Sequence, residues 1–143
     1  MVYEWSGLRY DVNGDGTVPE MRLRQSSWVW QRYGMSVGGK RYTRGVSVRG
    51  GSSVVVDLNR RCTAYDALVG VDDMTLGLGR AVFSVYADGG LLWRSGVVAG
   101  RDAAVPVHVD LTGRGTVRLE VSGRGAGLDR VAPADWAEAR FSC

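Results

Sequence analysis

The sequence has little from which a catalytic site could be built. Its only histidine, His108, stands in the alternating segment VPVHVDL, which places it on the solvent face of a strand. A hydrolytic triad requires a base that a third group orients within a pocket, and no nucleophile-elbow, zinc-protease or phosphate-binding glycine motif occurs. Two carboxylates could still hydrolyse a glycoside, but a small fold with short loops offers little cleft for one. We therefore expect a protein that is not an enzyme.

Long apolar runs are also missing. No run approaches the roughly 20 residues that a membrane span needs, so we expect no membrane insertion. Residues 1–30 lack the charged, apolar and small-residue regions of a signal peptide. We interpret the chain as a mature or excised domain of a larger secreted or cell-surface protein. A cytoplasmic protein would lack the signal as well.

Lysine is nearly absent, because all of the 18 basic residues except Lys40 are arginines. These arginines are scattered along the chain rather than packed into a tract, and 15 acidic residues offset them to a net charge of +3. A protein that reads nucleic acid concentrates its basic residues on one face or carries a recognisable motif. We therefore predict no nucleic-acid partner.

Cysteine occurs only twice, as Cys62 and Cys143, and no C-x-x-C pair exists. A zinc–thiolate site is therefore not favoured. Two distant cysteines suit a single disulfide that fixes the C-terminus and stabilises the fold by about 4–5 kcal/mol. Two reduced, buried thiols are the alternative. We favour the disulfide and, with it, an extracellular setting.

What the sequence does contain is the pattern of a β protein. Twenty-one glycines and many valines favour short strands joined by tight turns. Strict alternation places apolar residues on one face in segments 105–111 and 116–122, and in 135–142 it directs Ala137, Ala139 and Phe141 inward. A strand with one buried and one solvent-exposed face is typical of antiparallel sheets. We predict an all-β antiparallel β-sandwich of the jelly-roll type.

The N-terminal segment 1–20 reads as a leader or early loop, and 21–143 as a single module. Within this segment, Asp11, Asn13 and Asp15 occupy the early ligand positions of a calcium loop, but Arg22 stands where the chelating carboxylate is expected. A turn with Asn and Gly at its corners accounts for the same residues without a metal ion. Calcium is the one cofactor these residues suggest.

Six segments from residue 37 onward follow one another in a characteristic order, namely VGGKRYTRGVSV (37–48), SSVVVDL (52–58), CTAYDALVGVDD (62–73), AVFSVYADGGLLWRSGVV (81–98), VPVHVDLTGRGTVRLEVSG (105–123) and DWAEARFSC (135–143). This series resembles the NPCBM domain, which is carbohydrate-binding module family fifty-one. The resemblance implies a secreted, galactose-binding-domain-like sandwich that acts as an accessory module of a glycoside hydrolase or other surface enzyme. It further implies binding of galactose-containing glycans.

Two departures from the family pattern affect the expected site. Arg49 stands where the family commonly has a histidine, and Asp129 is followed by Arg130 where the family has Asp-His. A sugar site needs an aromatic face and planar charged groups that reach neighbouring hydroxyls, a task that suits arginine. We predict Arg49, Asp129 and Arg130 as the polar set, with Trp136 or Tyr42 beside them.

The adjacent pair Asp72 and Asp73 follows a strand and precedes a glycine-rich loop, as in the family. We expect a structural role for it, with one carboxylate accepting backbone N–H bonds and the other facing solvent, an arginine or an ion. The sequence as a whole predicts a non-catalytic glycan-binding module. The alternative is a structural or protein-interaction sandwich that has lost its sugar site.

Overall fold

The computed structural model describes residues 1–5, 8–10, 19–22, 26–27, 29–59, 61–123 and 132–143, and strands dominate them. A short 3-10 helix, Asp73–Thr75, follows β7. The strands in chain order are β1 (Val2–Glu4), β2 (Arg9–Tyr10), β3 (Glu20–Met21), β4 (Trp30–Val37), β5 (Lys40–Arg49), β6 (Ser52–Asp57), β7 (Ala64–Val71), β8 (Arg80–Ala87), β9 (Gly90–Arg94), β10 (Val98–Ala99), β11 (Val105–Asp110), β12 (Thr116–Gly123) and β13 (Pro133–Ser142).

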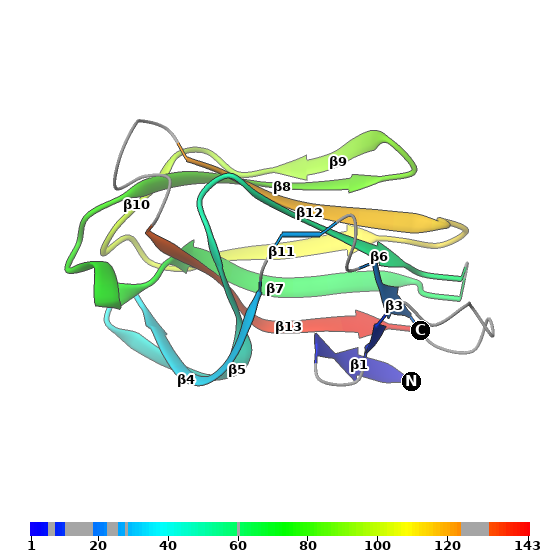
Figure 1. Cartoon of the computed structure of the whole chain (residues 1–143), viewed down its shortest axis with the longest axis horizontal. Coiled ribbons are helices and arrows are strands. Elements are labelled where there is room, and N and C mark those ends of the chain that lie inside the picture. Colours follow the sequence, from blue (N-terminus) through cyan, green and yellow to red (C-terminus); the bar gives the residue numbers. More distant parts are fainter. Residues whose placement is uncertain (6–7, 11–18, 23–25, 28, 60, 124–131) are drawn as a thin grey trace.

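These strands form two stacked sheets (Figure 1). Sheet A has the order β11-β7-β13-β5-β4, with β1 also paired to β13. Sheet B has the order β10-β8-β12-β6-β3-β2, with β9 also paired to β8. Apart from the short parallel β2–β3 pair, the pairs between described strands are antiparallel. From β5 to β8, and again from β11 to β13, successive strands alternate between the sheets, so the predicted all-β jelly-roll sandwich is confirmed.

The main core lies between the two sheets. The alternating residues of β11 and β12 are buried there as predicted, namely Val107, Val109, Val117, Leu119 and Val121. The ring of Trp136 lies at the centre of an aromatic group, 5.4 Å from Phe83 and 6.0 Å from Tyr65 between centroids, with edge-to-face geometry in both pairs. Such pairs add about 0.5–1.5 kcal/mol to the free energy gained by burying the rings.

Strand β13 changes phase in its middle, which the sequence pattern did not predict. Its pairing with β7 shifts register between Ala137 and Arg140, and Glu138 has a positive φ of 50°. Ala139 and Phe141 therefore face the main core as expected, whereas Ala137 faces the opposite side of sheet A. One extra residue in a strand reverses the faces of the residues beyond it, and simple alternation cannot anticipate it.

A second, smaller core lies on that opposite side of sheet A. It consists of Met35, Val37, Tyr42 and Ala137, with Leu68 and Ala104 packed against it. The β4–β5 hairpin supplies three of these residues and covers the outward-facing Gly70 of β7. A Cβ at Gly70 would lie 2.2 Å from Cγ1 of Val37, so the hairpin packs directly on the strand backbone.

The two ends of the chain meet at one end of the sandwich. Strand β1 pairs with the end of β13, and the amino group of Met1 donates to the carbonyl of Cys143 at 2.5 Å. Cys143 is disulfide-bonded to Cys62, as predicted. Although the sequence suggested a leader over 1–20, Trp5 and Leu8 in that segment belong to the main core. Among the described residues, no helix has the length and apolarity to cross a membrane.

Removal of the disulfide tests its contribution to stability. The double variant Cys62→Ala, Cys143→Ala should lose about 4 kcal/mol of unfolding free energy, because the bridge closes a loop between residues 81 positions apart. Urea denaturation measures this loss. Reductant should destabilise the wild type and leave the variant unchanged. Equal urea midpoints for the two proteins would contradict the expected role.

The variant Gly70→Ala tests the packing of the hairpin on sheet A. The added methyl group meets Val37, so we expect a loss of about 1–3 kcal/mol from overpacking, measured by urea denaturation. Gly96→Ala is the matched control, because a Cβ there meets nothing within 4 Å. Equal effects of the two substitutions would show that the hairpin does not rest on Gly70.

Candidate functional site

Asp72 holds the turn that follows β7. Its Oδ1 accepts from the backbone N–H of Met74 at 2.9 Å, and its carbonyl accepts from the hydroxyl of Thr75 at 2.9 Å. It is thus the N-cap of the 3-10 helix and satisfies donors that a helix start leaves unpaired. This is the structural role that the sequence predicted for one member of the pair.

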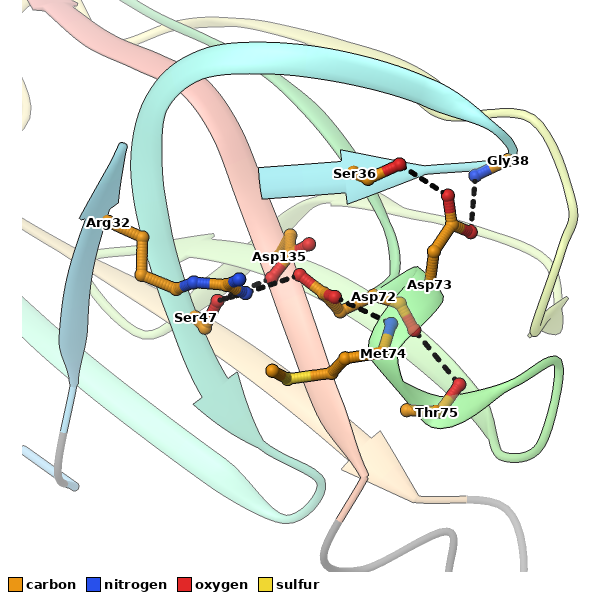
Figure 2. Close-up of polar contacts among 9 residues, drawn as sticks. All are labelled: Arg32, Ser36, Gly38, Ser47, Asp72, Asp73, Met74, Thr75 and Asp135. Atoms are coloured by element: carbon orange, nitrogen blue, oxygen red, sulfur yellow. Dashed lines mark hydrogen bonds and ion pairs between the residues drawn. The ribbon is translucent and has the colours of Figure 1, made fainter. Parts of the chain in front are cut away.

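Asp73 holds the tip of the β4–β5 hairpin. Its carboxylate accepts from the hydroxyl of Ser36 at 2.5 Å and from the backbone N–H of Gly38 at 3.0 Å (Figure 2). It also accepts from the backbone N–H of Gly39 at 2.8 Å. The Ser36 hydrogen bond, and then those from the two glycines, lower the pKa of Asp73 below its ordinary value. The second carboxylate therefore anchors the hairpin that covers sheet A; it stays partly exposed, and the charge of Arg101 also lowers its pKa.

A third carboxyl group, Asp135, lies behind the pair. The second oxygen of Asp72, Oδ2, accepts from Nη1 of Arg32 at 2.5 Å, and the same nitrogen contacts Oγ of Ser47 at 3.1 Å. The Ser47 hydroxyl donates to Oδ1 of Asp135 at 2.6 Å. Figure 2 shows these groups converging from β4, β5, β13 and the end of β7. We refer to Arg32, Ser47, Asp72 and Asp135 as the carboxyl network.

Asp135 retains its proton at neutral pH. The residue is fully buried, and burial, followed by the adjacent carboxyl of Asp72, raises the pKa of Asp135 to about 9. Its Oδ2 accepts no hydrogen bond from the described residues, and the neighbouring carboxyl of Asp72 raises its pKa. A proton on Oδ2 that is donated to Asp72 accounts for both facts, and one arginine then neutralises the single remaining charge.

The carboxyl network supports an exposed surface at the edge of sheet A. The guanidinium carbon of Arg32 lies 4.5 Å from the ring centroid of Trp30, a cation–π geometry, and Trp30 is 43% exposed. Trp30 pairs with Ser47 across β4 and β5, and the exposed Arg49 is two residues further along the same face. Diagonal neighbours of this kind lie about 7–8 Å apart. We call Trp30, Arg32 and Arg49 the Trp30 surface.

The Trp30 surface offers an aromatic ring and guanidinium groups, and the network orders Arg32 beside that ring. Such a set can bind a ligand with an apolar face and several hydroxyls, and it contains no nucleophile with an activating base. Within the described ranges, no group of three or more acidic, histidine or cysteine residues is arranged to hold a metal ion.

The predicted site residues fall in different places. Arg49 is exposed and lies opposite Pro133, the first residue of β13. Trp136 is 1% exposed within the main core, so its ring has no face available for stacking on a ligand. Tyr42 is 8% exposed and belongs to the second core, with the ammonium of Lys40 5.4 Å from its ring centroid. The other predicted residues, Asp129, Arg130, Asp11, Asn13 and Asp15, lie outside the described residues.

Sequence reasoning did not place Trp30 in the expected site, and it missed Arg32 and Asp135. The sequence did contain a feature that could have identified Asp135, because this residue precedes Trp136 in a segment that resembles the family. Arg32 had none, since it is one of many scattered arginines and its partner Asp72 is 40 residues away in the chain.

Comparisons with known proteins extend over nearly the whole chain. The sequence model for the family described as "NPCBM/NEW2 domain" matches residues 3–142. The chain is 38% identical over 140 residues to a Renibacterium salmoninarum protein named "Putative endo-alpha-N-acetylgalactosaminidase". That alignment covers 98% of this chain but 9% of the relative, so the chain spans less than a tenth of that protein.

Two solved structures from Clostridium perfringens share the fold. One is CBM51 from GH95 in complex with methyl-galactose, with a TM-score of 0.77 and 19% identity over 99% of this chain and 100% of that one. The other is CBM51-2 with INT domains from ZmpB in complex with GlcNAc, with a TM-score of 0.78 and 20% identity over 99% of this chain and 31% of that one.

The protonated state of Asp135 predicts a pH dependence of stability. The folded protein keeps a proton that the unfolded chain releases above about pH 4, so this group makes stability fall as the pH rises toward 9, by at most about 1.4 kcal/mol per pH unit. Asp135→Asn keeps the hydrogen bonds and cannot ionise. Urea denaturation at pH 5 and pH 8 should therefore show that the unfolding free energy of the variant, relative to that of the wild type, is higher at pH 8 than at pH 5.

Asp110→Asn is the control for this experiment, because Asp110 is an exposed carboxylate whose pKa is lowered by the N–H and hydroxyl of Thr112. It should leave the pH dependence between pH 5 and pH 8 as in the wild type. Parallel stability curves for Asp135→Asn and the wild type would show that Asp135 is ionised in the folded protein.

Proposed function

The chain belongs to the NPCBM/NEW2 domain family, and we propose that it is a non-catalytic carbohydrate-binding module that holds an attached enzyme or surface protein at a glycan. The observation that carries this proposal is the Trp30 surface, a half-exposed indole beside two arginines at one end of the sandwich. The solved structures with this fold that hold methyl-galactose and GlcNAc support a sugar as the ligand.

The ligand fits the chemistry of the surface. One face of a galactose ring presents C–H groups that suit an indole, and its hydroxyls accept from guanidinium N–H groups. Arg49 takes this role directly, and Arg32 is a positioning residue because Asp72 and Ser47 hold it beside the ring. Asp129 and Arg130 complete the proposed polar set. We propose a galactose-type sugar, in keeping with the name of the Renibacterium relative.

The position of the chain ends suits an accessory module. Arg49 lies beside Pro133, whereas Val2 and Cys62 lie beside Ser142 and Cys143, at the other end of β13. Partners joined through either terminus would lie away from the Trp30 surface. The disulfide favours an oxidising compartment, so we propose a secreted or cell-surface protein.

A second candidate function is a structural or protein-interaction sandwich. The ion pair of Arg32 with Asp72 favours it, because this arginine already has a buried partner and its side chain is only 15% exposed. Such a module would keep the carboxyl network for stability and bind no sugar.

Sugar titration of two variants separates these functions. Trp30→Ala and Arg49→Ala should each weaken binding of methyl β-galactoside at least tenfold, since each removes a direct ligand contact, and calorimetry or a glycan array measures the change. Tyr33→Ala is the matched control, because Tyr33 lies on the same strand and is 77% exposed. It should bind as the wild type does.

Two results would contradict the proposal. If the wild type binds neither galactosides nor N-acetylated hexosamines at millimolar concentration, the protein-interaction function is favoured. If it binds them and the Trp30 and Arg49 variants bind equally well, the sugar site lies elsewhere on the module.

A further inference from the structure

A groove of about 360 Å³ lies on the outer face of sheet B. Residues of β8 and β12 line it together with the turn after β9. Phe83 and Val85 of β8 point into the main core. Because side chains alternate along a strand, Ser84 and Tyr86 project outward into the groove. The Trp30 surface belongs to the outer face of sheet A, so the two lie on opposite sides of the sandwich. The volume falls in the range of small-ligand sites.

A row of polar side chains crosses this groove. Strand pairing places Arg94 of β9 beside Ser84 of β8, and Ser84 beside Glu120 of β12. Nε of Arg94 contacts the Ser84 hydroxyl at 3.4 Å, and its Nη2 donates to the hydroxyl of Tyr86 at 3.1 Å. The guanidinium is therefore held in place, and within the described part of the chain Nη1 makes no contact.

Glu120 is held on the other side of the row. Its Oε2 lies 3.3 Å from Nε of Arg118, and the Arg118 guanidinium in turn lies 4.5 Å from the centroid of the Tyr86 ring. The described residues leave Oε1 of Glu120 without a partner. A fixed donor and a fixed acceptor thus face the same groove, separated by the width of β8.

These groups select the chemistry of a ligand. An anion would meet Glu120 and a cation would meet Arg94 and Arg118, so a neutral ligand is the class that meets no like charge. A neutral ring with adjacent hydroxyls can accept from Arg94 and donate to Glu120 at the same time. Val82 and Val97 supply apolar contacts in the same groove. This combination of a few fixed polar groups with apolar side chains is typical of sites for small polar molecules.

We propose that this groove is a second saccharide site, in which Arg94 and Glu120 bind the hydroxyls of one neutral sugar ring. It rests on the lining of the groove and does not require sugar binding at the Trp30 surface. Two sites on opposite faces would let one module bridge two glycan chains, and a bridging ligand raises the overall affinity by making the second contact intramolecular.

Amide shifts in a ¹⁵N-labelled protein test this site residue by residue. Methyl β-galactoside, N-acetylglucosamine and glucose are added to the wild type and to Trp30→Ala. At least one sugar should shift the amides of 82–86, 94–97 and 120–122 with saturation, at a Kd of about 1 mM. These shifts should remain in Trp30→Ala, which separates the groove from the Trp30 surface.

Two further variants probe the groove. Glu120→Ala should weaken the groove response at least tenfold, and Ser122→Leu, an exposed position that fills the groove, should abolish it. Thr43→Leu, an equally exposed strand position on sheet A, is the control and should leave it unchanged. Thermal unfolding of each variant shows whether the fold is kept.

Three outcomes would overturn the proposal. The groove amides could show no saturable shift with any of the three sugars, they could respond equally in Ser122→Leu, or they could respond to galacturonate as strongly as to the neutral galactoside. Shifts confined to the amides around Trp30 and Arg49 would refute the second site and support the first. A response of the groove amides alone would support the second site and count against a sugar site at the Trp30 surface.

Discussion

The burial of carboxyl groups at the end of β7 is the constraint on which the rest of this structure depends. Asp72 and Asp135 are buried together where a core strand leaves the sandwich, beside the partly exposed Asp73, and ionised carboxylates could not share such a place without compensation. The structure resolves the conflict in three ways. Asp73 receives three hydrogen bonds, Asp72 receives Arg32, and Asp135 keeps its proton.

The same contacts determine how the β4–β5 hairpin lies on sheet A. Asp73 holds its tip, Arg32 ties its base to Asp72, and the second core fills the space between. Since Trp30 is on the same hairpin, the buried charges also fix the exposed surface. A binding surface whose side chains are already ordered loses less entropy when a ligand binds. Here one network both stabilises the fold and preorganises the proposed site.

The two sheets of the sandwich have different outer faces. Sheet A is covered by its own hairpin and exposes the Trp30 surface at one end, whereas sheet B leaves a polar groove between β9, β8 and β12. The main core requires apolar residues only on the inner faces of the strands. The outer faces are therefore free to carry arginines, serines and acids, and both proposed sites use this freedom.

The sequence by itself determined the sandwich, the buried faces of β11 and β12, the disulfide and the structural role of the Asp72–Asp73 pair, because these follow from local periodicity, from cysteine count and from turn chemistry. Only the tertiary structure decided that the bulge at Glu138 turns Ala137 outward, that Trp136 and Tyr42 are packing residues, and that Arg32 pairs with Asp72. These outcomes depend on residues that are far apart in the chain and meet only after the strands have paired. Side-chain burial and ion pairing at such long-range contacts are properties of the assembled sheets, and they cannot be inferred from a short segment of sequence.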